Sequence, residues 1–145
     1  MKIPAGLDDN LIYLIGEVQN LTYKELVSKF RSQGHGVTVE QFSILVLLKY
    51  TNGIRQQDIA DALRRDKTTI TRVLSNMQKN GLLLRSKDAD DARTNRIYLT
   101  EKGTKIQKEM VKVSGEVYMK AMRICPDEDV DIAIKTLRRI IINLE

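Results

Sequence analysis

The 145-residue chain has no tryptophan, one cysteine and one histidine, and each scarcity excludes a class of site. A single cysteine cannot form an intrachain disulfide, which favours a reducing compartment. A zinc site needs several His, Cys or carboxylate ligands, and His35 and Cys125 alone do not supply one. These two residues lie about ninety positions apart and offer no Cys-His or Ser-His-Asp arrangement. We therefore expect no metal, no cofactor and no enzymatic activity.

Long hydrophobic runs are also missing. The longest aliphatic run, Ile44–Leu48, is far shorter than the roughly 18 residues of a membrane span. Gly6, Asp8 and Asp9 interrupt the N-terminal region, so no signal peptide is expected. These absences predict a cytoplasmic protein without a membrane partner. Hydrophobic residues make up 42% of the chain and aromatics 5%, which is enough for one mainly aliphatic core.

Acidic residues are outnumbered, and the excess is local. The net charge is +5, and residues 64–102 alone hold ten Lys or Arg against five Asp or Glu, a difference of +5. This region therefore accounts for the net charge of the whole chain. A basic region favours a polyanionic partner such as nucleic acid. An ordinary solvated face is the alternative for a charge cluster taken alone.

The helical period dominates the N-terminal half. Apolar residues recur at steps of three and four along a first helix that is expected to end near Gly34 and Gly36, where glycine permits positive φ. Thr38 and Gln41 form a capping-box pattern before a second helix that ends near 52–53. The stripe of the first helix comprises Leu7, Leu11, Leu14, Val18 and Leu21.

A short third helix over 55–63 and a fourth helix from Asp66 to Asn80 follow. Asp66 is the natural N-cap of the fourth, and Gly81 suits a left-handed stop. The short apolar segments 82–86 and 96–100 predict two strands joined by a polar hairpin loop over 87–95. A fifth helix starts after Thr100 and a sixth near Pro126.

This order predicts a mainly α, α+β fold: a winged helix-turn-helix with N- and C-terminal dimerisation helices. The chain divides into residues 1–37, an N-terminal helix and loop; 38–102, the DNA-binding region; and 103–145, the C-terminal helices, all within one domain. The terminal helices carry more apolar surface than the DNA-binding lobe can cover. A second copy of the chain would cover it through an isologous interface. An intramolecular bundle is the alternative.

The fourth helix has a polar face that suits base readout. With Ile70, Leu74 and Met77 turned inward, about 100° per residue places a threonine- and arginine-rich face outward. The N-terminal half of such a helix enters the major groove, where Arg pairs with guanine and Thr methyls touch thymine. An ordinary exposed polar face is the alternative. The predicted base contacts are Thr68, Thr69 and Arg72, with Ser75 and Asn76 beside them.

Other basic and polar residues suit the DNA backbone. Arg93, near the hairpin tip, is placed to enter a narrow minor groove, and Asp91 is placed to hold its guanidinium by a charge-assisted hydrogen bond. Asn95 flanks them on the wing. The residues predicted to contact phosphates are Arg55, Gln56, Arg64, Arg65, Lys67, Lys87 and Arg96.

Five ordered motifs carry a resemblance to a known family. The chain resembles the MarR family of bacterial and archaeal transcriptional regulators over about residues 54–103, and the helical order extends the likeness over nearly the whole chain. The motifs are Gln57-Asp58-Ile59-Ala60, Asp66-Lys67-Thr68-Thr69-Ile70-Thr71-Arg72, Gly81-Leu82-Leu83, Asp91-Ala92-Arg93 and Leu99-Thr100-Glu101-Lys102-Gly103.

The resemblance implies a homodimer that binds a pseudo-palindromic double-stranded operator. It implies that Arg93 is the wing arginine, with Asp91 its orienting partner, and that Thr68, Thr69 and Arg72 occupy recognition-helix positions. It also implies dimerisation through the first, fifth and sixth helices. The expected interface residues on these helices are Leu7, Leu11, Leu14, Val117, Ile134, Leu137 and Ile141.

The resemblance also implies a signal. Many members release DNA when a small phenolic or other anionic compound binds between the dimerisation and DNA-binding regions, and others respond to thiol oxidation or zinc. The first helix here has no cysteine, and Cys125 is interpreted as a structural thiol. Tyr13, Phe42 and Tyr118 are candidates for an effector pocket, with packing as their alternative role. The sequence therefore predicts a repressor released by an effector; the alternative is a winged-helix protein-interaction module.

Overall fold

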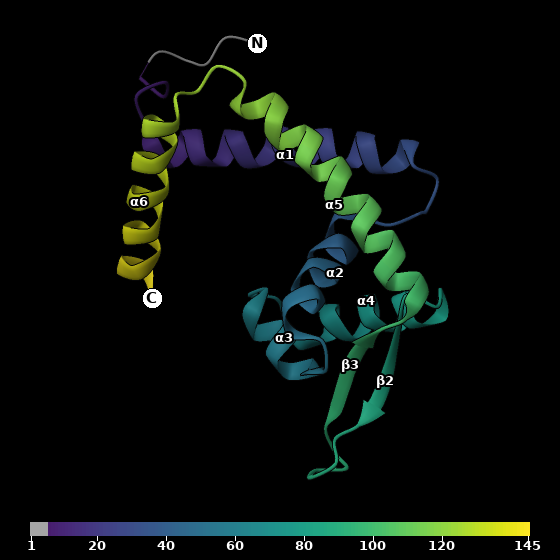
Figure 1. Ribbon diagram of the computed structural model, residues 1–145. Coiled ribbons are helices and arrows are strands. Elements are labelled where there is room, and N and C mark those ends of the chain that lie inside the picture. Colours follow the sequence, from purple (N-terminus) through teal and green to yellow (C-terminus); the bar gives the residue numbers. More distant parts are fainter. Residues whose placement is uncertain (1–5) are drawn as a thin grey trace.

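The computed structural model describes residues 6–145, which form six α-helices and three short strands (Figure 1). The mainly helical α+β class expected from the sequence is confirmed. The elements in chain order are α1 (Leu11–Ser32), α2 (Val39–Thr51), β1 (Ile54–Arg55), α3 (Gln56–Ala62), α4 (Lys67–Lys79), β2 (Leu83–Lys87), β3 (Asn95–Leu99), α5 (Glu101–Met122) and α6 (Asp127–Leu144).

Side-chain caps fix where the main helices begin. Asp66 accepts the N–H of Thr69 at 2.8 Å, and Thr100 caps α5 through the N–H of Gly103 at 2.9 Å. Both confirm the predicted starts, because a capping oxygen satisfies an N–H that the first turn leaves without a helical acceptor. The first helix differs from expectation. It begins at Leu11 after the cap Asn10, so Leu7 lies in the preceding turn.

The sheet has three strands, not the two that the sequence predicted. Strand order is β1-β3-β2, with both pairings antiparallel. Strand β1 is only two residues long and pairs Ile54 with Ile97 and Arg55 with Arg96. A strand this short carries no detectable alternation, which is why the sequence pattern missed it. Its pairing connects the start of α3 to the base of the wing.

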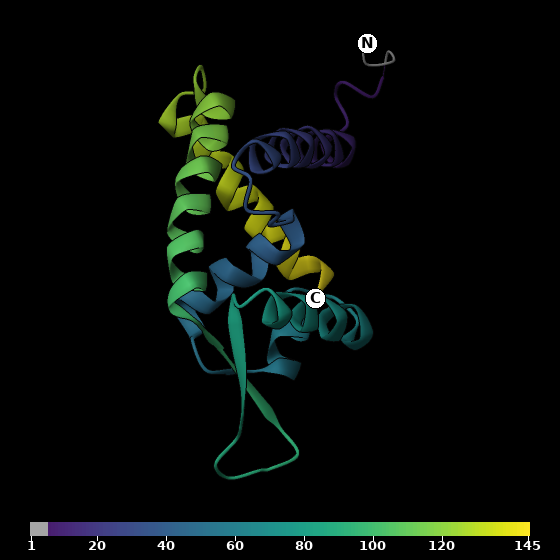
Figure 2. The same cartoon turned by 90° about the vertical axis from the view of Figure 1, so that its right-hand side faces the viewer.

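The core lies where α2, α4 and the sheet meet. Leu45, Leu48, Leu74, Met77 and Ile97 have 0% exposed area. They come from three separate segments, so the relative position of α4 and the wing depends on one shared apolar cluster. Rotation of the ribbon by 90° shows α5 running lengthwise beside this lobe and the wing extending from its lower end (Figure 2).

The terminal helices leave apolar side chains uncovered. Helix α1 packs against α5 and α2, whereas α6 contains no buried residue and stands to one side in Figure 1. Leu11, Ile134 and Ile141 are 41–51% exposed. Val117 was also predicted to lie in the dimer interface, but it is already buried against the rest of the chain. Within residues 6–145 no helix is long and apolar enough to cross a membrane.

Candidate nucleic-acid interface

Helix α4 turns the predicted polar face to the outside. Thr68, Arg72 and Ser75 are exposed, while Ile70 and Leu74 on the opposite face are buried. The predicted stripe therefore orients the helix correctly. A guanidinium flanked by short hydroxyl side chains on one exposed helix face matches the donor and methyl pattern that the major groove accepts.

Thr69 makes more hydrogen bonds within the protein than Thr68 or Arg72 does. Its hydroxyl donates to Asp66 Oδ2 at 2.6 Å and its N–H to Oδ1 of the same carboxylate at 2.8 Å. These two bonds hold the pKa of Asp66 below its ordinary value. The hydroxyl of Thr69 thus stabilises the start of α4, which leaves its methyl group as the part available to a base.

Ser75 and Asn76 take part in hydrogen bonds inside the protein. The Ser75 hydroxyl donates to the carbonyl of Thr71 at 2.8 Å and accepts from Arg85 Nη2 at 3.2 Å. Asn76 Oδ1 accepts from Gln41 Nε2 at 2.8 Å. Arg85 and Gln41, which the sequence interpretation did not select, therefore brace α4 from β2 and from α2.

The residues predicted around α3 divide into two groups. Gln56 Nε2 donates to the Thr71 hydroxyl at 2.9 Å, so it ties α3 to α4 inside the helix-turn-helix and does not stand clear as a phosphate ligand. Arg64 has a φ of 50° in the turn between the helices and pairs with Glu145 at the end of α6. Lys67 and Arg65 remain exposed beside the start of α4.

The wing tip presents Arg93 to solvent, as predicted, but Asp91 acts differently. Asp91 Oδ1 accepts the backbone N–H of Arg93 at 3.0 Å, and Oδ2 accepts the Thr94 hydroxyl at 2.8 Å. These bonds hold the pKa of Asp91 below its ordinary value. The structure thus corrects the predicted guanidinium contact: Asp91 shapes the turn and leaves the Arg93 side chain pointing outward.

A buried carboxylate organises the base of the wing. The Asp88 side chain is 1% exposed, and Oδ2 lies 2.5 Å from Arg96 Nε and 3.8 Å from Arg55 Nε. Its Oδ1 accepts the N–H of Asp90 at 2.9 Å. The backbone bond and the Arg96 guanidinium lower the pKa of Asp88.

Arg96 therefore has a structural role that the sequence did not predict. Its Nη1 also donates to the carbonyl of Gly53 at 2.8 Å, so Nε and Nη1 of the guanidinium are both engaged within the protein. The contact of Arg96 with a DNA phosphate stays a prediction, and its side chain is 35% exposed. Arg55 on β1 is half-exposed, and Lys87 at the end of β2 is exposed.

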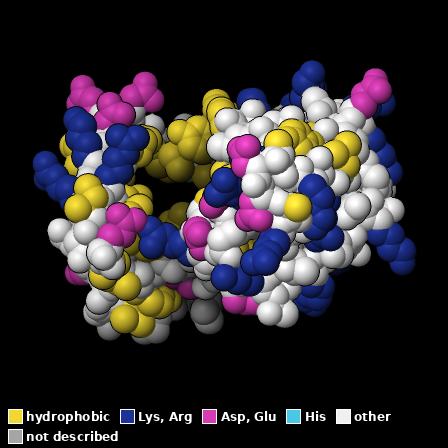
Figure 3. Space-filling view, turned by 90° about the horizontal axis from the view of Figure 1, so that it is seen from below, with side chains coloured by type: hydrophobic (Ala, Val, Ile, Leu, Met, Phe, Trp, Pro, Cys, Tyr) yellow, Lys and Arg dark blue, Asp and Glu magenta, His cyan; other side chains and the backbone are white. Residues whose placement is uncertain are grey.

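A small niche lies between α4 and the wing. It measures about 270 Å³ and brings Lys67 of α4 next to Arg93 and Asn95 of the wing. Gln57, which sequence reasoning missed, lines it from α3. Two cations and polar amides line it, and these are side-chain types that contact DNA phosphates in known complexes. Seen from the wing side, dark blue Lys and Arg side chains are spread over this lobe (Figure 3).

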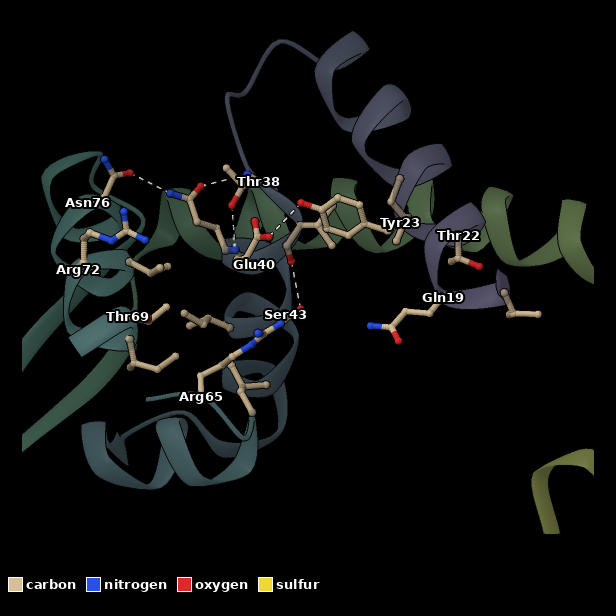
Figure 4. A pocket seen from close by; sticks show the side chains of 18 of the residues that line it. Gln19, Thr22, Tyr23, Thr38, Glu40, Ser43, Arg65, Thr69, Arg72 and Asn76 are labelled. Atoms are coloured by element: carbon tan, nitrogen blue, oxygen red, sulfur yellow. Dashed lines mark hydrogen bonds between the residues drawn. The ribbon is translucent and has the colours of Figure 1, made fainter. Parts of the chain in front are cut away.

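A larger groove of about 1070 Å³ separates α1 from the lobe (Figure 4). Apolar walls from Val18, Leu26 and Val73 enclose polar groups that include Arg65 and Arg72. Arg72 also lies on the exposed face of α4, so the groove and the face predicted to read DNA share a side chain.

None of the three predicted pocket residues lines this groove. Phe42 packs edge-on against Phe30 in the core, with ring centroids 5.0 Å apart. Tyr118 is 55% exposed on α5, and Tyr13 lies half-buried on α1. The tyrosine that does line the groove is Tyr23.

Tyr23 and Glu40 form the polar centre of the groove. The Tyr23 hydroxyl donates to Glu40 Oε1 at 3.0 Å, which raises the pKa of Tyr23. Backbone hydrogen bonding, that hydroxyl and the nearby charge of Arg65 lower the pKa of Glu40. An ionised carboxylate thus lies near guanidinium groups, a setting that can bind both a donor and an anion.

The described residues hold no group of three or more His, Cys, Asp or Glu side chains arranged to bind a metal. His35 instead lies 2.7 Å from Glu109 of α5 through Nε2 and Oε2. Cys125 is exposed between α5 and α6.

A two-helix unit with an exposed Thr/Arg face, followed by an Arg-tipped hairpin, defines a winged helix-turn-helix of the DNA-binding class. Residues 37–94 match the family model described as MarR family. Through this region the chain belongs to the MarR family of winged helix-turn-helix transcriptional regulators, a family of non-enzymatic proteins.

Curated relatives agree with this assignment. Transcriptional regulator SarZ of Staphylococcus haemolyticus is 26% identical over 125 residues, which cover 85% of this chain and 84% of SarZ. Regulator TtmR of Methylorubrum extorquens is 27% identical over 110 residues, which cover 74% of this chain and 54% of TtmR. The chain thus spans about half of TtmR and most of SarZ.

Solved structures share the fold over nearly the whole chain. A MarR regulator from Methanosarcina mazei is 27% identical, with a TM-score of 0.78 over 90% of this chain and 95% of that one. The repressor CouR bound to a 23-mer DNA duplex is 22% identical, with a TM-score of 0.85 over 97% and 99% of the two chains. CouR from Rhodococcus jostii bound to p-coumaroyl-CoA is 21% identical, with a TM-score of 0.81 over 94% of each chain.

Proposed function

We propose that this chain acts in the cytoplasm as a homodimeric repressor that binds a pseudo-palindromic operator and is released by a small-molecule effector. The observation that carries the DNA part is the presence of one exposed arginine on the recognition-type helix and another near the wing tip. Arg72 projects from α4 and Arg93 from the wing tip, and the basic niche lies between α4 and the wing. These positions suit one arginine in the major groove and the other in the adjacent minor groove.

The uncovered apolar surface of α1 and α6 supports the dimer. Leu11, Ile134, Leu137 and Ile141 are each between 38% and 51% exposed in the single chain, and α6 buries no residue of its own. Exposed apolar area of this extent on two helices is typical of a protein–protein interface. A second copy with the same faces would cover both helices and place two recognition helices on one side of a duplex.

The groove between α1 and the lobe supports effector control. It joins apolar walls to the Tyr23–Glu40 pair and to two guanidiniums, so an aromatic ring that carries an anionic group fits its chemistry. Solved structures of CouR, which shares the fold, include one bound to DNA and one bound to p-coumaroyl-CoA. An anion in the groove would compete with DNA for Arg72, and this supports release on binding.

Selection of bound sequences from random duplex DNA tests the operator. We expect an inverted repeat whose half-site centres lie about one helical turn, roughly 10 base pairs, apart. The affinity for it should fall linearly with salt on logarithmic axes. Enrichment of a single half-site would contradict the dimer. Enrichment of no sequence, with recovery of a protein partner instead, would favour a protein-interaction module.

A groove-filling variant tests the effector. Thr22 lines the groove from α1 and lies far from the recognition face in the sequence. Thr22→Phe should leave operator affinity unchanged but abolish release by hydroxylated aromatic carboxylates. Equal release from wild type and Thr22→Phe would place the effector elsewhere.

A further inference from the structure

Gln41 is one of three buried polar side chains among the described residues, and both ends of its amide are engaged. It is 6% exposed near the start of α2. Its Oε1 accepts the N–H of Thr38 at 3.2 Å, completing the capping box, and its Nε2 donates to Asn76 Oδ1 at 2.8 Å (Figure 4). Rotation of this amide would break both bonds in a buried place, so its orientation is fixed.

Asn76 is oriented in turn. Its Oδ1 accepts a second hydrogen bond from Asn80 Nδ2 at 3.1 Å, so both acceptor sites of this oxygen are occupied. No described residue accepts a hydrogen bond from Asn76 Nδ2. In Figure 4 this nitrogen lies on the side of Asn76 away from Gln41. The exposed side chain therefore offers its surroundings a donor and no acceptor.

We infer that Gln41 sets the hydrogen-bonding polarity of the recognition helix, by holding Asn76 so that only its N–H donor faces DNA. The partner of Asn76 is then an acceptor: guanine O6 or N7, adenine N7, thymine O4, or a phosphate oxygen. The bidentate adenine contact typical of Asn is excluded, because it needs the amide oxygen as well. Gln41 is a positioning residue that acts through Asn76. This inference rests on the proposed operator binding.

Gln41→Glu separates the two functions of the side chain. A glutamate keeps the acceptor for Thr38 and so preserves the capping box. It cannot donate to Asn76, and its carboxylate instead attracts Asn76 Nδ2. The Asn76 amide then turns over and presents Oδ1 to DNA. We expect operator affinity to fall roughly tenfold or more at fixed salt, because an acceptor now faces an acceptor.

The source of the acceptor is resolved by repeating the measurement with every base pair of the selected half-site replaced. With a base-edge partner, Gln41→Glu shifts the preference at one position away from G and T, which present only acceptors in the major groove, and toward A and C, which present amino donors. With a phosphate partner, affinity falls by the same factor for all sequences. Unchanged affinity and unchanged preference at every position would overturn the inference.

Two controls separate this effect from stability and from added charge. Thr38→Ala removes the capping hydroxyl but leaves the Gln41–Asn76 bond, so it should lower Tm without changing base preference. Gln41→Glu in an Asn76→Ala background should have no further effect on DNA binding; an equal loss there would show that the new charge acts directly and would overturn the inference. If the wild type selects no sequence at all, the proposed function itself fails, which is a separate result.

Discussion

Replacing Gly103 with alanine reverses the effect that helix propensity alone predicts. Gly103 lies in the first turn of α5, where an added Cβ would stand 1.9 Å from the carbonyl oxygen of Leu82 and 2.9 Å from its carbon. Both are backbone atoms of the connection between α4 and β2. Ordinary contact begins at 3.4 Å, so the two segments must separate by about 1.5 Å.

The magnitude follows from two opposed effects. Alanine favours a helix over glycine by about 1 kcal/mol. Overpacking against backbone costs about 1–3 kcal/mol or more, and the upper end applies because Leu82 also accepts the N–H of Thr100. We expect a net loss of about 2 kcal/mol and a fall in Tm of roughly 5–10 °C for a chain of this size.

Thermal unfolding followed by circular dichroism measures the change, and the same helix provides a matched control. Gly115 has no atom within 4 Å of an added Cβ, so Gly115→Ala should keep or raise Tm. If Gly103→Ala raised Tm as Gly115→Ala does, the close packing of α5 on the α4–β2 connection would be refuted.

Four further substitutions test the wing and the dimer. Arg93→Ala should weaken binding to duplexes with A·T-rich flanks and leave Tm unchanged, since its side chain has no internal partner among the described residues. Arg96→Ala should instead lower Tm. Fluorescence anisotropy measures the DNA affinity of each variant and thermal melts measure its Tm, so the two effects can be distinguished. Asp88 has a folded pKa below its ordinary value, so its stabilisation is present above about pH 4 and is lost as the pH falls further. Asp88→Asn should therefore be less stable at neutral pH and show a flatter loss between about pH 4 and 2; an unchanged acid profile would contradict the ion pair. Leu137→Glu should convert the dimer to a monomer in sedimentation experiments, and a persistent dimer would place the interface elsewhere.

Local patterns predicted the features that local physics controls. The caps at Asp66 and Thr100 depend on oxygens three residues from their amides, and the outward turn of Arg72 depends on a repeat of about 100° per residue. Both could be recognised without tertiary information. The exposure of Arg93 followed from its place in a polar hairpin loop.

The rest required long-range contacts. The capping box predicted one end of the Gln41 amide, whereas its bond to Asn76 joins residues 35 positions apart. Arg96 was assigned to a phosphate because a long cation in a basic wing suggests one. Its engagement by Asp88 and Gly53 depends on how the sheet folds back on β1. Phe42 was predicted to line an effector pocket, but it packs against Phe30 from another helix in the core.

The most direct test of the central claim compares the affinities of this protein for its selected operator and for a shuffled duplex at physiological salt. We expect the operator to bind at least about 10³-fold more tightly, and Arg72→Ala to reduce that ratio by roughly tenfold to a hundredfold. Equal affinity for the two duplexes would contradict sequence-specific readout by α4.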